Sequence, residues 1–61
     1  MTQEHLNIIK NNCSVRATDK EYIEAYMEAV NLGYASDEEN GWSSNPSALI
    51  AFIDGFLIGK G

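Results

Sequence analysis

Cysteine is nearly absent from this chain, and its scarcity excludes the cross-link on which many small domains depend. Cys13 is the only cysteine among 61 residues, so no intramolecular disulfide can form. A domain of this length buries only about 60% of the surface that its unfolded chain exposes, which leaves it marginally stable without further support. Cys13 and His5 are too few soft ligands for a structural zinc site. We expect no metal and no cofactor, so association of subunits remains as the stabilising device.

Positive charge is also scarce. Four lysine and arginine residues stand against nine acidic residues, and the formal net charge is −5. Proteins that bind nucleic acids usually present the opposite, a basic patch along the phosphate backbone. Lys10, Arg16 and Lys20 lie close together in the sequence and are the only support for a helix-turn-helix DNA binder, which is the least favoured interpretation. We expect no direct binding to nucleic acid.

Long apolar runs are missing as well. The longest, Ala48 to Ile58, is interrupted by Asp54 and Gly55 and is far shorter than the roughly 20 residues that span a membrane. The N-terminal segment MTQEHLNIIK is polar and does not resemble a signal peptide. A lone cysteine suits a reducing compartment. We therefore expect a soluble cytoplasmic protein that does not bind membranes.

The residues that are present predict two amphipathic helices in the first half of the chain. Residues 2–12 begin with Thr2 as an N-cap and place apolar side chains on one side. In residues 18–33, Thr18 and Glu21 have the spacing of a capping box, and Gly33 is a typical C-terminal stop. The apolar arc of this second helix, roughly 200° wide, is broader than one neighbouring helix requires.

A third helix is predicted over residues 45–59, because Asn45 and Pro46 form a typical N-terminus. A strand is the competing interpretation of its apolar run, but no pairing strand is present. Large apolar side chains cover about 160° of this helix. A second strip is made of small residues, Ala48, Ala51, Gly55 and Gly59, and Ser47 and Asp54 form a polar seam. The sequence thus predicts one all-α domain of three helices, residues 1–61.

The apolar character of the third helix has two explanations. The helix is either the central core helix, clasped by the first two, or it also packs against a second protein chain. We favour the second explanation, because two short amphipathic helices offer little surface to cover it. The predicted homodimer interface consists of apolar side chains on the third helix, the second helix and the loop between them: Tyr26, Val30, Trp42, Leu49, Phe52, Ile53, Phe56 and Leu57.

Three carboxylates, Glu21, Glu24 and Glu28, are predicted to line one side of the second helix. They either keep the protein soluble or form an acidic face that binds a basic protein, and such a face can imitate a phosphate backbone. No pattern of reactive residues accompanies them. His5 and Cys13 would be about 12 Å apart along one helix, beyond hydrogen-bond reach. The acidic segment 37–41 lacks the alternating ligands of a calcium loop. We expect no catalytic activity.

The whole chain resembles the small accessory proteins that temperate, lambda-like bacteriophages encode in their non-essential early regions. The resemblance is carried by the compact single-domain layout and by two segments, EYIEAYMEAVNLGY and NPSALIAFIDGFLIGKG. It implies an early phage factor, located in the host cytoplasm, that influences host growth or the choice between lytic and lysogenic development through protein contacts. No functional residue can be carried over, since the resemblance includes no established motif.

Together these patterns predict a small acidic interaction factor, without enzymatic activity, that acts as a homodimer and binds a host or phage protein. The alternative function is that of an acidic inhibitor that mimics nucleic acid and blocks a nucleic-acid-binding protein. The sequence does not identify the partner or the biological process.

Overall fold

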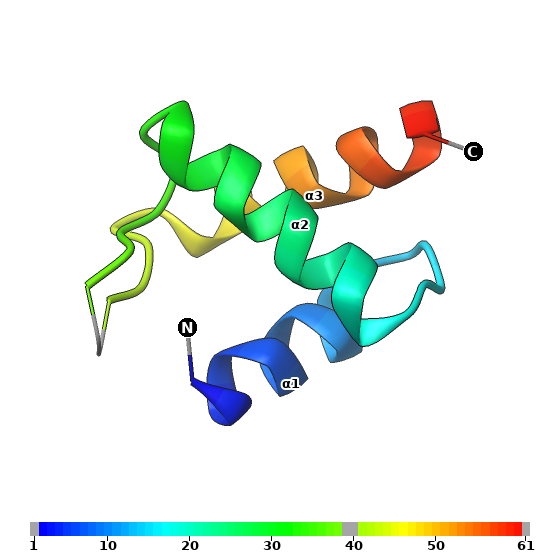
Figure 1. Ribbon diagram of the computed structural model, residues 1–61, viewed down its shortest axis with the longest axis horizontal. Coiled ribbons are helices and arrows are strands. Elements are labelled where there is room, and N and C mark those ends of the chain that lie inside the picture. Colours follow the sequence, from blue (N-terminus) through cyan, green and yellow to red (C-terminus); the bar gives the residue numbers. More distant parts are fainter. Residues whose placement is uncertain (1, 39–40, 61) are drawn as a thin grey trace.

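The computed structural model describes residues 2–38 and 41–60, which fold into three helices without a strand. These are α1 (Gln3–Asn12), α2 (Asp19–Asn31) and α3 (Pro46–Lys60). Figure 1 shows α2 crossing the front of the molecule, with α1 below it and α3 above and behind it. The all-α prediction is confirmed, and the predicted helix ends lie within two residues of the observed ones. Within these residues no helix has the length and apolarity needed to cross a bilayer.

The helix ends form as the local sequence predicts. The capping box of α2 is complete, since Thr18 Oγ1 accepts from the Glu21 backbone amide while the Glu21 side chain accepts from the Thr18 amide. At the start of α3, the Asn45 side-chain oxygen accepts from the amide of Ala48 at 3.3 Å. Gly33 adopts φ +87°, the left-handed conformation that ends many helices and that glycine adopts without steric cost.

The core lies where α2 faces the other two helices. It contains ten buried side chains: Leu6, Ile9, Cys13, Tyr22, Ala25, Tyr26, Ala29, Leu49, Ile53 and Leu57. Helix α2 packs more extensively against α3 than against α1, and α1 and α3 make few direct contacts. The hydroxyl groups of Tyr22 and Tyr26 donate to the backbone oxygens of Val15 and Ser36 at 2.7 and 2.8 Å, so both buried phenols also anchor loops. Helix α2 is therefore the central element. One of the two explanations for the apolar third helix places α3 at the centre instead.

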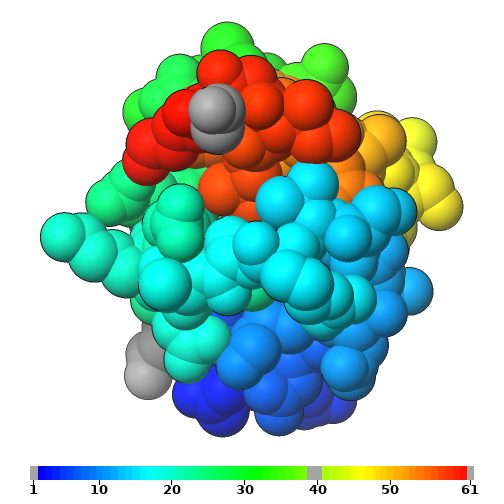
Figure 2. Space-filling view, turned by 90° about the vertical axis from the view of Figure 1, so that its right-hand side faces the viewer, coloured from blue at the N-terminus to red at the C-terminus, as the bar shows by residue number. Residues whose placement is uncertain are grey.

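Asp54 fastens the connection between α1 and α2 to α3. Its carboxylate accepts hydrogen bonds from the backbone amides of Ser14, at 3.0 and 3.1 Å, and Val15, at 3.2 Å. Figure 2 shows this connection, in cyan, lying directly against the orange and red C-terminal part of α3. We call the arrangement the Asp54 latch. It joins parts of the chain that are about 40 residues apart in the sequence.

Candidate interaction surfaces

The eight residues of the predicted interface divide into two groups. Four of them are at most 5% exposed and belong to the core of the protomer: Tyr26, Leu49, Ile53 and Leu57. The other four pack against the core from its edge and remain partly accessible: Val30, Trp42, Phe52 and Phe56. A side chain that the protomer already encloses cannot also contact a second copy. Only the second group therefore remains available for an interface in this fold.

The side of α3 that faces away from the core is uncovered, and we call it the outer side of α3. It carries the exposed residues Ala51, Gly55, Ile58 and Gly59. Ile58 is 66% exposed, the highest value among the large apolar side chains of residues 2–38 and 41–60. A Cβ atom placed on Gly55 or Gly59 would meet no atom within 4 Å, so neither glycine is required by packing inside the protomer. Three of the four residues in the predicted strip of small residues, Ala51, Gly55 and Gly59, are thus exposed, whereas Ala48 is half-buried.

An aromatic row, formed by Tyr34, Phe52 and Phe56, joins the loop after α2 to α3. The ring centroids of Tyr34 and Phe52 are 5.1 Å apart, and those of Phe52 and Phe56 are 6.1 Å apart. The Lys60 ammonium group lies 5.7 Å from the centroid of Phe56 and ends the row. Tyr34 is 43% exposed, and Leu32 of the same turn is 59% exposed. The row is therefore an apolar surface that the protomer leaves open.

The three carboxylates of the predicted acidic face differ in their hydrogen-bond and ion-pair partners. Glu21 is part of the capping box, and the hydrogen bond from the Thr18 backbone lowers the pKa of its carboxyl group. Glu24 forms an ion pair with Lys60, which lowers the pKa of Glu24. Glu28 forms no ion pair or side-chain hydrogen bond with the described part of the chain. The stripe therefore offers one unengaged carboxylate to solvent instead of three.

Two of the three residues of the predicted basic cluster, Lys10 and Arg16, make contacts that stabilise the fold. Lys10 pairs with Asp19 at 2.9 Å, which links the end of α1 to the start of α2. The Arg16 guanidinium donates to the backbone oxygens of Lys10, at 2.7 Å, and Cys13, at 3.0 Å, and thereby satisfies carbonyl groups at the end of α1. With Lys10 and Arg16 so engaged, the structure offers no argument for DNA binding by these residues.

His5 and Cys13 occupy separate environments. The His5 ring stacks on Trp42 with centroids 4.4 Å apart. Cys13 is 2% exposed, and burial, reinforced by the nearby Asp54 carboxylate, raises the pKa of its thiol to about 11. Such a thiol is a poor nucleophile at neutral pH, because the thiolate is the reactive form. Residues 39 and 40 of the acidic segment 37–41 lie outside the described residues.

We expect alkaline pH to destabilise the protein through Cys13. The unfolded thiol loses its proton near the ordinary pKa of 9.0, whereas the folded thiol keeps it up to about 11. The stabilising contribution is complete below pH 9 and is lost as the pH rises toward 11, with a slope of up to about 1.4 kcal/mol per pH unit. Urea unfolding at several pH values between 8.5 and 10 measures this slope. In the variant C13A the unfolding free energy should depend less on pH. An equal slope in both proteins would mean that a group other than Cys13 causes the effect.

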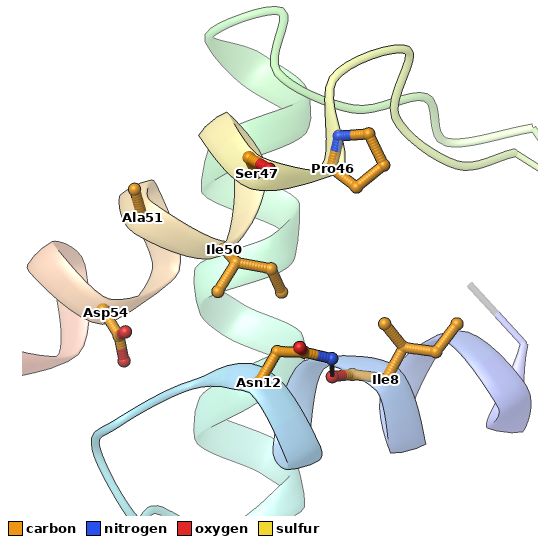
Figure 3. Close-up of a pocket in the computed structure, with 7 residues that line it drawn as sticks. All are labelled: Ile8, Asn12, Pro46, Ser47, Ile50, Ala51 and Asp54. Carbon is orange, nitrogen blue, oxygen red and sulfur yellow. Dashed lines mark hydrogen bonds between the residues drawn. The ribbon is translucent and has the colours of Figure 1, made fainter.

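A shallow groove of about 430 Å³ separates α1 from α3. Figure 3 shows Ile8 and Asn12 of α1 on one side and Ile50, Ala51 and Asp54 of α3 on the other. The Asn12 side-chain amide donates to the Ile8 backbone oxygen at 2.7 Å, and both Asp54 oxygens accept from backbone amides. The main polar groups of the groove are thus already bonded within the chain. Sequence patterns could not predict the groove, because it arises from the spacing between two helices.

The described residues therefore present apolar contact area on the outer side of α3, on the aromatic row, in the groove between α1 and α3, and at Ile23 and Met27 of α2. Among residues 2–38 and 41–60, no group of three or more His, Cys, Asp or Glu side chains is placed to hold a metal ion. Comparisons with models of protein families, with curated proteins and with solved structures find no match for this chain.

Proposed function

We propose that the protein is a small acidic interaction factor, without enzymatic activity, that acts as a homodimer through the outer side of α3. Its resemblance to accessory proteins of temperate phages supports a regulatory role exerted through protein contacts, in host growth or in lytic and lysogenic development. The observation that supports the proposed dimer is the exposure of Ile58. This apolar side chain is 66% accessible near the C-terminal end of a mostly apolar helix.

The chemistry of the outer side of α3 suits contact between two helices. Ala51 and Gly55 are exposed and small, so another helix can approach the backbone closely at these positions. Full burial of an isoleucine side chain contributes about 1.5–3 kcal/mol. In a dimer with twofold symmetry each such contact occurs twice, since the same patch of both subunits is used. Two copies of Ile58 packed over small residues would therefore anchor the interface.

The variant I58K tests this dimer. Lysine is a good helix former and suits the C-terminal turn of a helix, so the fold should persist while the apolar contact is lost. Sedimentation equilibrium at micromolar concentration should give a dimer for the wild type and a monomer for I58K. The matched control is M27K, which makes the same change of charge at an apolar residue of α2 that is 46% exposed. M27K should remain a dimer.

Circular dichroism checks that both variants keep their helices. A wild-type protein that sediments as a monomer contradicts the proposed dimer. A dimer that I58K leaves intact contradicts the outer side of α3 as its interface, and dissociation by M27K instead assigns the contact to α2.

The structure does not favour the alternative of nucleic-acid mimicry. A mimic presents several unengaged carboxylates with a regular spacing, whereas Glu21 caps α2 and Glu24 pairs with Lys60. We therefore do not propose an acidic inhibitor of a nucleic-acid-binding protein.

A further inference from the structure

We infer that the aromatic row, together with Glu28 of α2 and Leu32 in the turn after α2, is a docking surface for a cationic amphipathic helix of a partner protein. The inference rests on the proposed function, since it requires that the protein acts through protein contacts, and it adds the chemistry of the partner. It does not involve Ile58, which carries the proposed dimer, because Phe52 and Phe56 lie on another side of α3.

The surface combines several apolar groups that the protomer leaves accessible. Leu32 and Tyr34 are 59% and 43% exposed, and Phe52 and Phe56 are only partly buried. Tyrosine is among the residues enriched at the sites that contribute most to protein contacts, and accessible apolar side chains beside it add area that a partner can bury. The neighbouring left-handed Gly33 turns the chain back toward helix α2, and the Tyr34 amide donates to the Ala29 backbone oxygen at 2.9 Å. The row is therefore held in place before any partner arrives.

The spacing of the aromatic row matches that of a helix. Its successive ring centroids are 5.1 and 6.1 Å apart, close to the 5.4 Å pitch of an α-helix. Apolar side chains one turn apart on a docked helix would therefore lie over successive rings. Recognition of amphipathic helices commonly uses such anchors at three- and four-residue spacing.

The charge around the row favours a basic partner, because Lys60, the cation at the row, is already paired with Glu24 and the remaining nearby charges of the described residues are acidic. Glu28 precedes Leu32 by one helical turn, and its carboxylate has no partner among the described residues. Asp37 and Glu38 follow Tyr34 along the loop and are exposed. The whole chain carries a net charge of −5. A helix with lysine or arginine beside its apolar stripe would meet opposite charge at the rim, which speeds association and excludes acidic competitors.

Docking on the row leaves Ile58 free. Phe52 and Phe56 lie about 120–160° around α3 from Ile58, according to the 100° rotation per residue. A dimer formed through Ile58 can therefore bind one such helix on each subunit.

A labelled synthetic peptide tests the inference directly. The probe is a helical peptide of leucine and lysine with an apolar stripe, and its control is an isomer of the same composition in which the stripe is scrambled. Fluorescence anisotropy should show binding of the first peptide to the full chain and at least tenfold weaker binding of the second. The same affinity for both would mean general attraction between opposite charges and would overturn the inference.

Two pairs of variants locate the site. L32S should weaken binding about tenfold by removing apolar contact, whereas I23S, at an apolar residue of α2 that is 41% exposed, should have little effect. E28Q should weaken binding about two- to fivefold at low salt, and E4Q, the same charge change on α1, should not. Equal effects of L32S and I23S, or of E28Q and E4Q, would show that the peptide binds at another site.

The proposed dimer and this docking surface can fail separately. The titration is repeated with I58K, and sedimentation equilibrium is repeated with L32S. A wild-type dimer that does not bind the peptide overturns the docking surface alone. A monomeric wild type that binds the peptide overturns the dimer alone. Dissociation of the dimer by L32S would show that a second copy covers the row in place of a partner helix.

Discussion

The variant I53A is expected to lose about 2–5 kcal/mol of unfolding free energy, the cost of removing a large apolar side chain from a closed core. Ile53 is 0% exposed at the contact between α3 and α2. A domain of this size has a total stability of about 3–9 kcal/mol, so the variant should be partly or fully unfolded at 25 °C. Urea unfolding followed by circular dichroism measures the change.

The matched control is I58A, the same substitution one and a half turns further along α3. Ile58 is 66% exposed, so little buried area is lost in the protomer, and alanine has the higher helix propensity. We expect a change within about 0.5 kcal/mol at concentrations where the protein is a monomer. Comparable losses for I53A and I58A would contradict the orientation of α3 described above.

Removal of the Asp54 latch is expected to have the second largest effect. In D54A the amides of Ser14 and Val15 lose a charged acceptor, and hydrogen bonds to charged groups contribute about 1.5–3 kcal/mol. We expect a loss of about 2–3 kcal/mol, measured by urea unfolding. D54N keeps one acceptor oxygen and should lose less.

The control for D54A is S47A, at the other residue of the polar seam predicted on α3. Ser47 is exposed, and its side chain makes no hydrogen bond with the described residues, so its substitution should be nearly neutral. If D54A were as stable as S47A, the bonds between Asp54 and the two amides would contribute nothing measurable to the fold.

The features that the sequence predicts well depend on neighbouring residues. The capping box of Thr18 and Glu21, the Asn45 cap and the left-handed Gly33 all involve contacts within about four residues, and all three are observed. The three helices follow from these signals together with apolar periodicity. This part of the fold is predictable because its hydrogen bonds are formed within short segments.

The division of α3 into buried and exposed sides was less predictable. Periodicity marks Phe52, Ile53 and Ile58 alike as apolar, but only the packing of α3 against α2 determines which of them is enclosed. The result is that half of the predicted interface belongs to the core, and Ile58, which the interface prediction omitted, is the most exposed large apolar residue.

The electrostatic contacts of the charged residues could also not be predicted from the sequence. Glu21, Glu24 and Glu28 look equivalent on a helical wheel, but Lys60 reaches Glu24 from another helix. Asp54 appears in the sequence as a polar interruption of an apolar helix. Its bonds to residues about 40 positions earlier depend on the tertiary arrangement. A solitary carboxylate in an apolar helix was the available signal for this latch.

The Asp54 latch also bears on the order in which the protein folds. The connection between α1 and α2, residues 13–18, is shorter than the connection between α2 and α3, residues 32–45, so both pairs of neighbouring helices can meet by closing loops much shorter than 40 residues. The latch instead closes a loop of about 40 residues, and the entropy cost of closing a loop grows with its length. We therefore expect the contacts of α2 with α1 and with α3 to form before the latch. Asp54 would then act late, by fastening the connection between α1 and α2 to α3 once the three helices have met.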